Sequence, residues 1–102
     1  MVRKKSKYRH ISIGKKKYFF YHIIWLDILG DSSHFSYSEF EKMRPAIMNT
    51  YAYVFKKDKK YLWTFASYDE ETFSDRNVFP IGCIKELKMI FTLHHLRPLK
   101  YY

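Results

Sequence analysis

Hydrophobic and polar residues along this chain follow the short period of β-strands more often than the longer period of helices. Five segments are rich in aromatic and β-branched residues, which suit a pleated and largely buried surface. Turn residues or prolines separate these segments, as expected between strands. The predicted strands are residues 18–28, 47–56, 60–68, 76–79 and 84–91, of which the last also fits a helical turn.

The two central segments flank the charged stretch Lys57-Asp58-Lys59 and together predict a β-hairpin. Strict alternation within them gives the two faces of this hairpin different characters. One face carries the smaller residues Ala52, Val54, Leu62, Thr64 and Ala66. The other face carries the aromatic residues Tyr51, Tyr53, Phe55, Tyr61, Trp63 and Phe65.

A helix start is signalled between the first strand and this hairpin. Ser36 can accept a hydrogen bond from the amide of Glu39, while the Glu39 side chain reaches back to the amide of Ser36. Phe35 and Phe40 occupy the two positions of a hydrophobic staple around this capping box. The pattern therefore predicts a helix that begins at Tyr37.

This helix is expected to be short. Pro45 excludes Arg44 from the α region, which leaves about two turns over residues 37–43. The apolar side chains of Phe40 and Met43 need cover, and the aromatic face of the hairpin is the expected place. The alternative is that the aromatic face stays open to solvent.

A chain of 102 residues is long enough for one domain with a single core. We predict an α+β fold that is mainly antiparallel β, with one short helix after the first strand. The order of elements favours a small five-stranded barrel of the SH3 or Sm-like kind, and an irregular roll is the competing topology. The globular domain is expected over residues 18–91, with a basic flexible arm before it (1–17) and a C-terminal tail after it (92–102).

Positive charge is concentrated in that arm. It holds eight of the nineteen Lys and Arg residues and no Asp or Glu, so eleven bases face ten acids in the rest of the chain. A block of like charge is typical of arms that find polyanions. The bases of the arm are Arg3, Lys4, Lys5, Lys7, Arg9, Lys15, Lys16 and Lys17.

The aromatic hairpin face is a second candidate site. Rings on small β-domains stack on the bases of single strands, and nearby lysines meet the phosphates. The expected rings are Tyr53, Tyr61 and Trp63, and the expected lysines are Lys56, Lys57, Lys59 and Lys60. Two alternatives stay open, because the same rings also suit a buried core face or a protein interface.

The sequence carries no pattern that predicts catalysis, a metal site or a cofactor. Residues 31–34 place Asp, Ser and His side by side, but a triad needs groups that converge from separate elements. Cys83 is the single cysteine, so no disulfide is expected within the chain. The longest apolar run, residues 18–29, falls short of the roughly 20 residues of a membrane helix. We therefore expect no membrane contact and a cytoplasmic location.

Three stretches resemble a class of short, mostly uncharacterised proteins of tailed bacteriophages. They are Ile24-Trp25-Leu26-Asp27, Thr50-Tyr51-Ala52-Tyr53-Val54-Phe55 and Val78-Phe79-Pro80-Ile81-Gly82-Cys83-Ile84. The similarity covers roughly residues 23–87 and leaves out the basic arm. It implies a phage origin and a related fold, and it implies no chemistry.

Together these features predict a non-enzymatic accessory binding protein that acts inside a host cell. Its expected partner is nucleic acid, or an acidic surface of a host machine that handles nucleic acid. Three alternatives remain: a protein-only inhibitor of a host or defence factor, a protein that sequesters a nucleotide signal, and a structural component of a virion or ribonucleoprotein assembly. The sequence does not predict an oligomeric state.

Overall fold

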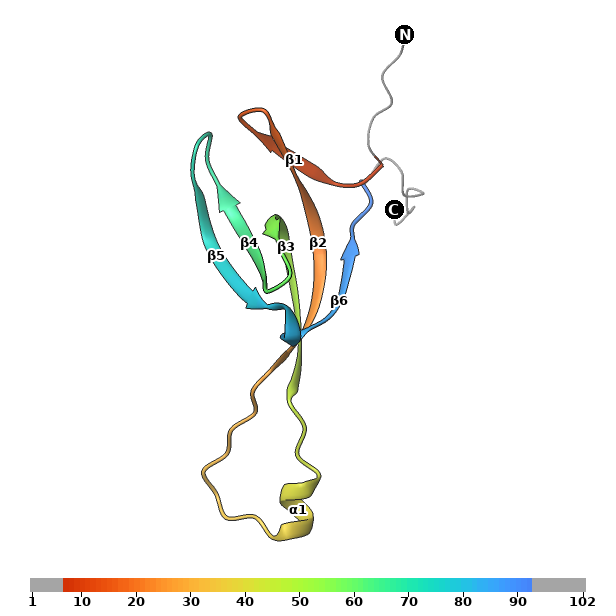
Figure 1. The fold of residues 1–102 in the computed structure, drawn as a ribbon, viewed down its shortest axis with the longest axis vertical. Coiled ribbons are helices and arrows are strands. Elements are labelled where there is room, and N and C mark those ends of the chain that lie inside the picture. Colours follow the sequence, from red (N-terminus) through yellow and green to blue (C-terminus); the bar gives the residue numbers. More distant parts are fainter. Residues whose placement is uncertain (1–6, 93–102) are drawn as a thin grey trace, which may run out of the picture.

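A computed structural model of the chain describes residues 7–92. These residues form one antiparallel sheet, one short α-helix and one 3₁₀ turn (Figure 1). The elements are β1 (His10–Ile13), β2 (Lys16–Asp27), α1 (Tyr37–Glu41), β3 (Ala46–Lys57), β4 (Tyr61–Tyr68), β5 (Phe73–Pro80), η1 (Ile81–Cys83) and β6 (Ile84–Met89).

The sheet is open and has six strands, so the prediction of a closed five-stranded barrel is wrong. Neighbouring strands follow the order β1-β2-β3-β4-β5, and β6 returns to pair with β2. The additional strand is β1, which comes from the basic segment. Closure fails because β5 and β6 are joined by η1 and do not pair with each other.

One edge of β2 is shared by β1 and β6, and Phe20 is the residue at which they meet. The amide of Phe20 donates to the carbonyl of Arg9 at 2.9 Å, and its carbonyl accepts from the amide of Ile90 at 3.0 Å. Arg9 in turn donates its amide to the carbonyl of Ile90 at 2.7 Å. Residues 10–17, within the expected arm, thus form a hairpin of the sheet.

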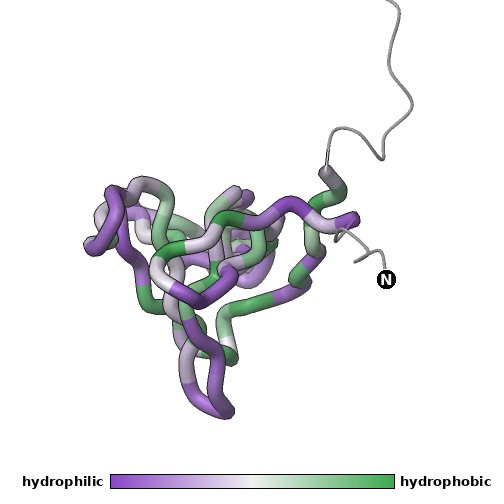
Figure 2. Tube along the Cα trace, turned by 90° about the horizontal axis from the view of Figure 1, so that it is seen from above, coloured by the Kyte–Doolittle hydropathy of each residue, from purple (hydrophilic) through white to green (hydrophobic). Residues whose placement is uncertain are grey.

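The buried residues form two clusters, one on each face of the curved sheet. The first contains Ile23, Ala52, Leu62 and Phe79, with Trp25 and Ile84 packed against it. The second contains Tyr18, Tyr53 and Phe65, with Ile11, Phe20 and Phe73 packed against it. Seen from above in Figure 2, hydrophilic stretches form the outer loops and hydrophobic stretches run between them. The sheet therefore has a mainly aliphatic face, which also holds the rings of Trp25 and Phe79, and an aromatic face. On the β3–β4 hairpin this is the division that the alternation predicts.

A β-bulge interrupts the alternation near the end of β3. The register shifts between Val54 and Lys56, which pair with Thr64 and Trp63 of β4. One residue, Phe55, is extra on this strand. Its ring reaches the aromatic cluster, where it lies 5.9 Å from the Tyr18 ring, while Lys56 lies over Trp63. The bulge thus places an aromatic ring and a cation next to each other on the aromatic face.

Helix α1 lies in a lobe, residues 28–45, that projects away from the sheet (Figure 1). The predicted capping box is confirmed, since the Glu39 amide donates to Ser36 Oγ and the Ser36 amide donates to Glu39 Oε1. The expectation that α1 packs on the aromatic face is wrong. No residue of α1 is buried, and Phe40 is 68% exposed. Part of the aromatic face, around Tyr53 and Phe65, is covered instead by the β1–β2 hairpin, whose first strand the sequence analysis assigned to a flexible arm.

Candidate nucleic-acid interface

A groove opens on the aromatic face, where β3, β4 and β5 lie side by side. Its volume of about 680 Å³ lies within the range of roughly 300–1,000 Å³ that is typical of ligand sites. The floor is Phe65, which is buried, while Phe55 and Val78 at the walls are 41% and 53% exposed. The residues that give the groove its chemistry are Phe55, Trp63, Phe65, Phe73, Arg76 and Val78.

Trp63 is the ring of this groove that is best placed to stack on a planar ligand. It is half-buried, and the Tyr61 ring contacts it edge-on at 5.7 Å between centroids. The ammonium group of Lys56 lies 5.2 Å from the centre of the indole. A cation over an aromatic ring is held there by the ring quadrupole. The site therefore combines a fixed aromatic surface with a positive charge next to it.

The turn between β3 and β4 brings further lysines to the same end of the groove. Asp58 orders this turn, because its Oδ1 accepts from the amides of Lys60 and Tyr61 at 2.8 and 2.7 Å. These two hydrogen bonds, that of Tyr61 first, hold the pKa of the Asp58 carboxyl below its ordinary value. The carboxylate is thus hydrogen-bonded to the backbone, and Lys57, Lys59 and Lys60 are exposed around it.

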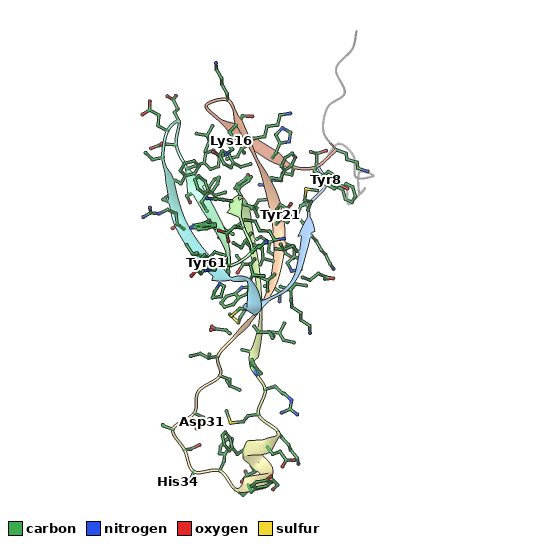
Figure 3. The ribbon with its side chains drawn as sticks, viewed as in Figure 1. Tyr8, Lys16, Tyr21, Asp31, His34 and Tyr61 are labelled. Atoms are coloured by element: carbon green, nitrogen blue, oxygen red, sulfur yellow. The ribbon has the colours of Figure 1, made fainter. Side chains whose placement is uncertain are left out.

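The β1–β2 hairpin reaches the opposite end of the groove. The Tyr18 ring lies 5.5 Å from Phe73, which lines that end. Lys15, Lys16 and Lys17 follow the tight turn at Gly14, whose φ of 64° is in the left-handed region that favours glycine. All three are exposed. In Figure 3, Lys16 lies at the upper end of the sheet, and Tyr61 lies at the lower ends of β4 and β5. Lysines therefore flank the groove at both ends.

The structure separates the predicted arm into residues with different roles. Arg9 is held on the aromatic face, with its guanidinium 4.1 Å from the Phe20 ring and a hydrogen bond of 3.5 Å to the Tyr53 hydroxyl. Lys7 lies 5.3 Å from the ring of Tyr8. Arg3, Lys4 and Lys5 lie outside the described residues.

Of the three rings predicted to stack, two are accessible. Tyr61 is 43% exposed and Trp63 is half-buried beside the groove. Tyr53 is only 6% exposed, and its ring packs on Phe20 and Phe65. A ring with both faces covered has no surface for a base, so the candidate interface rests on Tyr61 and Trp63.

Sequence reasoning missed the contribution of β5. Phe73 and Arg76 line the groove, but the segment before Arg76 reads as an acidic loop because Asp and Glu dominate it. Strand β5 begins at Phe73. The lone aromatic residue within a polar stretch was the available signal. Glu71, which also lines the groove, belongs to the turn in which Asp69 accepts hydrogen bonds from the amides of Glu71 and Thr72.

Other candidate chemistry is not supported by the described residues. Asp31 accepts from both the amide and the hydroxyl of Ser33, and these bonds, that of the hydroxyl first, lower the pKa of its carboxyl. Over residues 7–92, no group of three or more His, Cys, Asp and Glu is placed to hold a metal ion. In the same range no helix is long and apolar enough to cross a membrane.

Comparisons with protein families, curated proteins and solved structures found no match.

Proposed function

We propose that this protein binds single-stranded nucleic acid in the groove of its aromatic face. The observation that carries the proposal is the pairing of an accessible Trp63 ring with the Lys56 ammonium in an open groove that lysines flank at both ends. Base–aromatic stacking contributes about 1–3 kcal/mol per base in proteins that bind single strands. A chain with a formal net charge of +9 adds a phosphate attraction that does not depend on sequence.

Binding on this surface follows from the placement of its groups. A strand that lies along β5 places one base on Trp63, beside Tyr61 and Phe55. The phosphates on either side then meet Lys56 and Lys60 towards one end, and Lys16 towards the other. Glu71 lines the groove near the second end, so a phosphate is disfavoured at that point. The interaction involves no covalent step, and the protein acts as a binding module.

The order of the elements supports the same assignment. Strand β2, a long loop, the hairpins β3–β4 and β4–β5 and the 3₁₀ turn η1 lead to β6, which returns to pair with β2, and we interpret this order as an opened SH3-like arrangement. Small β-domains of this kind commonly present a sheet face to their ligand. The resemblance to short phage proteins extends the proposal to an accessory role in a host cell.

Tryptophan fluorescence tests the proposal directly, because the chain has only two tryptophans. Trp25 lies outside the groove and donates its indole N–H to Thr50 at 2.9 Å. In a Trp25→Phe background, an oligothymidine should quench Trp63 emission. Its affinity should fall steeply with salt, with a slope set by the lysine contacts.

Two variants distinguish stacking from charge. Because Trp63→Ala removes the fluorescent reporter, its binding is measured by the fluorescence anisotropy of a dye-labelled oligothymidine. This variant should weaken binding by about 5- to 160-fold, which corresponds to 1–3 kcal/mol of stacking. Lys56→Gln with Lys60→Gln should reduce the salt slope, while Lys85→Gln on β6, away from the groove, should leave the affinity nearly unchanged. Binding that is indifferent to Trp63 and to the two groove lysines would contradict the proposal.

A further inference from the structure

One edge of β3 is open along its first half. Strand β3 pairs with β2 from Ala46 to Tyr53, but its pairing with β4 on the other edge begins only at Tyr53. Among the described residues, no strand pairs with the Ala46–Ala52 part of that edge. On its other edge β2 pairs with β6 over Tyr21–Trp25, so β3 is the outer strand of a three-stranded region there. Only the last two pairs, Leu26 with Ile47 and Asp27 with Ala46, form a two-stranded ribbon, and such ribbons are marginally stable alone.

This edge lacks the features by which proteins normally prevent unwanted strand pairing. Exposed edges usually carry lysine, proline or inward-pointing charges. Residues 46–55 contain no charged residue and no proline. Ile47 and Tyr51 are 57% and 55% exposed, and both lie on the aromatic face of the sheet. This composition suits an edge that pairs with another β-strand.

We infer that a second copy of this chain occupies the edge, through antiparallel pairing of β3 with its own symmetry mate. A twofold axis at Asn49, the centre of the unpaired run, places each exposed Ile47 directly opposite Tyr51 of the other copy. Pairs of β-branched and aromatic residues are among the favourable cross-strand neighbours. Because residues 46–52 are uncharged, the strand meets its own copy without repulsion.

The charge distribution favours the same arrangement. Antiparallel pairing places the lobe of each copy beside the body of the other. The lobe, residues 28–45, holds three acids and two bases, while the rest of the described chain, residues 7–27 and 46–92, holds twelve bases and seven acids. The lobe also exposes large apolar side chains, since Tyr37 is 84% and Leu29 is 53% exposed. Apolar patches of this kind mark interaction surfaces. A slightly acidic, apolar lobe therefore lies next to a strongly basic body.

Disulfide trapping tests the register of this dimer. In a Cys83→Ser background, Asn49→Cys places each thiol opposite its own copy, where the Cβ atoms are close enough for a disulfide. Ile47→Cys is the matched control, because the two thiols would lie about four residues, or roughly 13 Å, apart along the strands. We expect a dimer band from Asn49→Cys and little from Ile47→Cys. Equal crosslinking of the two variants would overturn the proposed register.

Sedimentation of the full chain, freed of nucleic acid, tests the association itself. The mass should rise from 12.6 kDa to twice that value as the concentration increases. Ile47→Lys should raise the dimer dissociation constant by roughly tenfold or more, because a charge on an edge strand opposes pairing. A protein that stays monomeric at every concentration would refute the inference. The groove is not part of this edge, so Ile47→Lys should still bind oligothymidine, and the two proposals fail separately.

Discussion

Three aspartates in the loops of this protein perform the same structural task. Asp31, Asp58 and Asp69 each accept hydrogen bonds from amides two or three residues further along the chain. At Asp31 the hydroxyl of Ser33, followed by its amide, lowers the pKa of the carboxyl, and at Asp58 and Asp69 the amides do so, because these bonds favour the charged form. These three carboxylates thus order the turns that they belong to. The turn at Asp58 holds lysines beside the groove.

Thr64 is a buried residue whose hydroxyl group forms no hydrogen bond within the described residues. It is 2% exposed on the aliphatic face of β4, and its hydroxyl oxygen finds no hydrogen-bond partner within residues 7–92. Burying a hydroxyl without a partner costs free energy. A β-branched residue suits this strand position, but the hydroxyl itself contributes nothing that the described structure shows.

Thr64→Val should therefore stabilise the protein. Valine keeps the branched shape and removes the unpaired hydroxyl, so the free energy of unfolding should rise by about 1 kcal/mol. Urea denaturation followed by circular dichroism measures this change, with Thr50→Val as the comparison. Thr50 accepts the indole N–H of Trp25, so its replacement should destabilise. A loss of stability in Thr64→Val would show that the hydroxyl has a partner.

At the scale of single elements, α1 shows which properties of a helix the local sequence determines and which it does not. The capping residues Ser36 and Glu39 determine where the helix begins, and both bonds form as expected. Where the helix packs is not determined locally, because that depends on which other segment covers the aromatic face first. The β1–β2 hairpin provides this cover through Tyr18 and Ile11, so α1 stays in the lobe without burying a residue.

Ser36→Ala tests whether α1 is independent of the sheet. Loss of an N-cap costs about 1 kcal/mol when the helix is part of the cooperative core. Since α1 has no buried residue, the variant should change the global free energy of unfolding by less than about 0.5 kcal/mol. Leu62→Ala, in the core, should cost about 2–5 kcal/mol in the same experiment. A full cap penalty in Ser36→Ala would show that the lobe and the sheet unfold together.

The hairpin β3–β4 was the element most completely predictable from sequence. Alternation of aromatic and small residues identified both faces, and Asp58 marked the turn. The bulge at Phe55 was not predictable, because a single extra residue leaves no trace in a period-two pattern until its partner strand is known. The same limit applied to the groove, since its β5 side depends on pairing with β4 and not on the local sequence.

At the scale of the whole molecule, the basic segment is the main difference between expectation and structure. Eight positive charges suggest a solvated arm, because charge repulsion opposes compact structure. The apolar residues Ile11 and Ile13 lie between those charges and pack on Tyr18 and Phe65. The lysines remain exposed on the outside of the same hairpin. The β1–β2 hairpin thus contributes apolar side chains to the core on one side and positive charge to the protein surface on the other.

Tyr18→Ala should distinguish a hairpin of the sheet from an arm. The Tyr18 ring contacts Phe55, Phe65 and Phe73, and the residue is 7% exposed. Removing a buried aromatic ring costs about 3–5 kcal/mol, whereas a change in a solvated arm stays within about 0.5 kcal/mol. Chemical denaturation gives the difference. A near-neutral effect would place the hairpin outside the cooperative unit.

The arrangement of strands around Phe20 also limits how early the sheet can be completed during synthesis of the chain. The first long strand to leave the ribosome is β2, yet its partner β6 is the last strand of the described chain. Until β6 emerges, β2 exposes an unpaired edge to every neighbouring nascent chain. Contacts between segments so distant in sequence make folding slow, and exposed edges invite aggregation in the interval. Conditions that delay the synthesis of β6 should therefore lower the yield of folded protein, even though the finished sheet is unchanged.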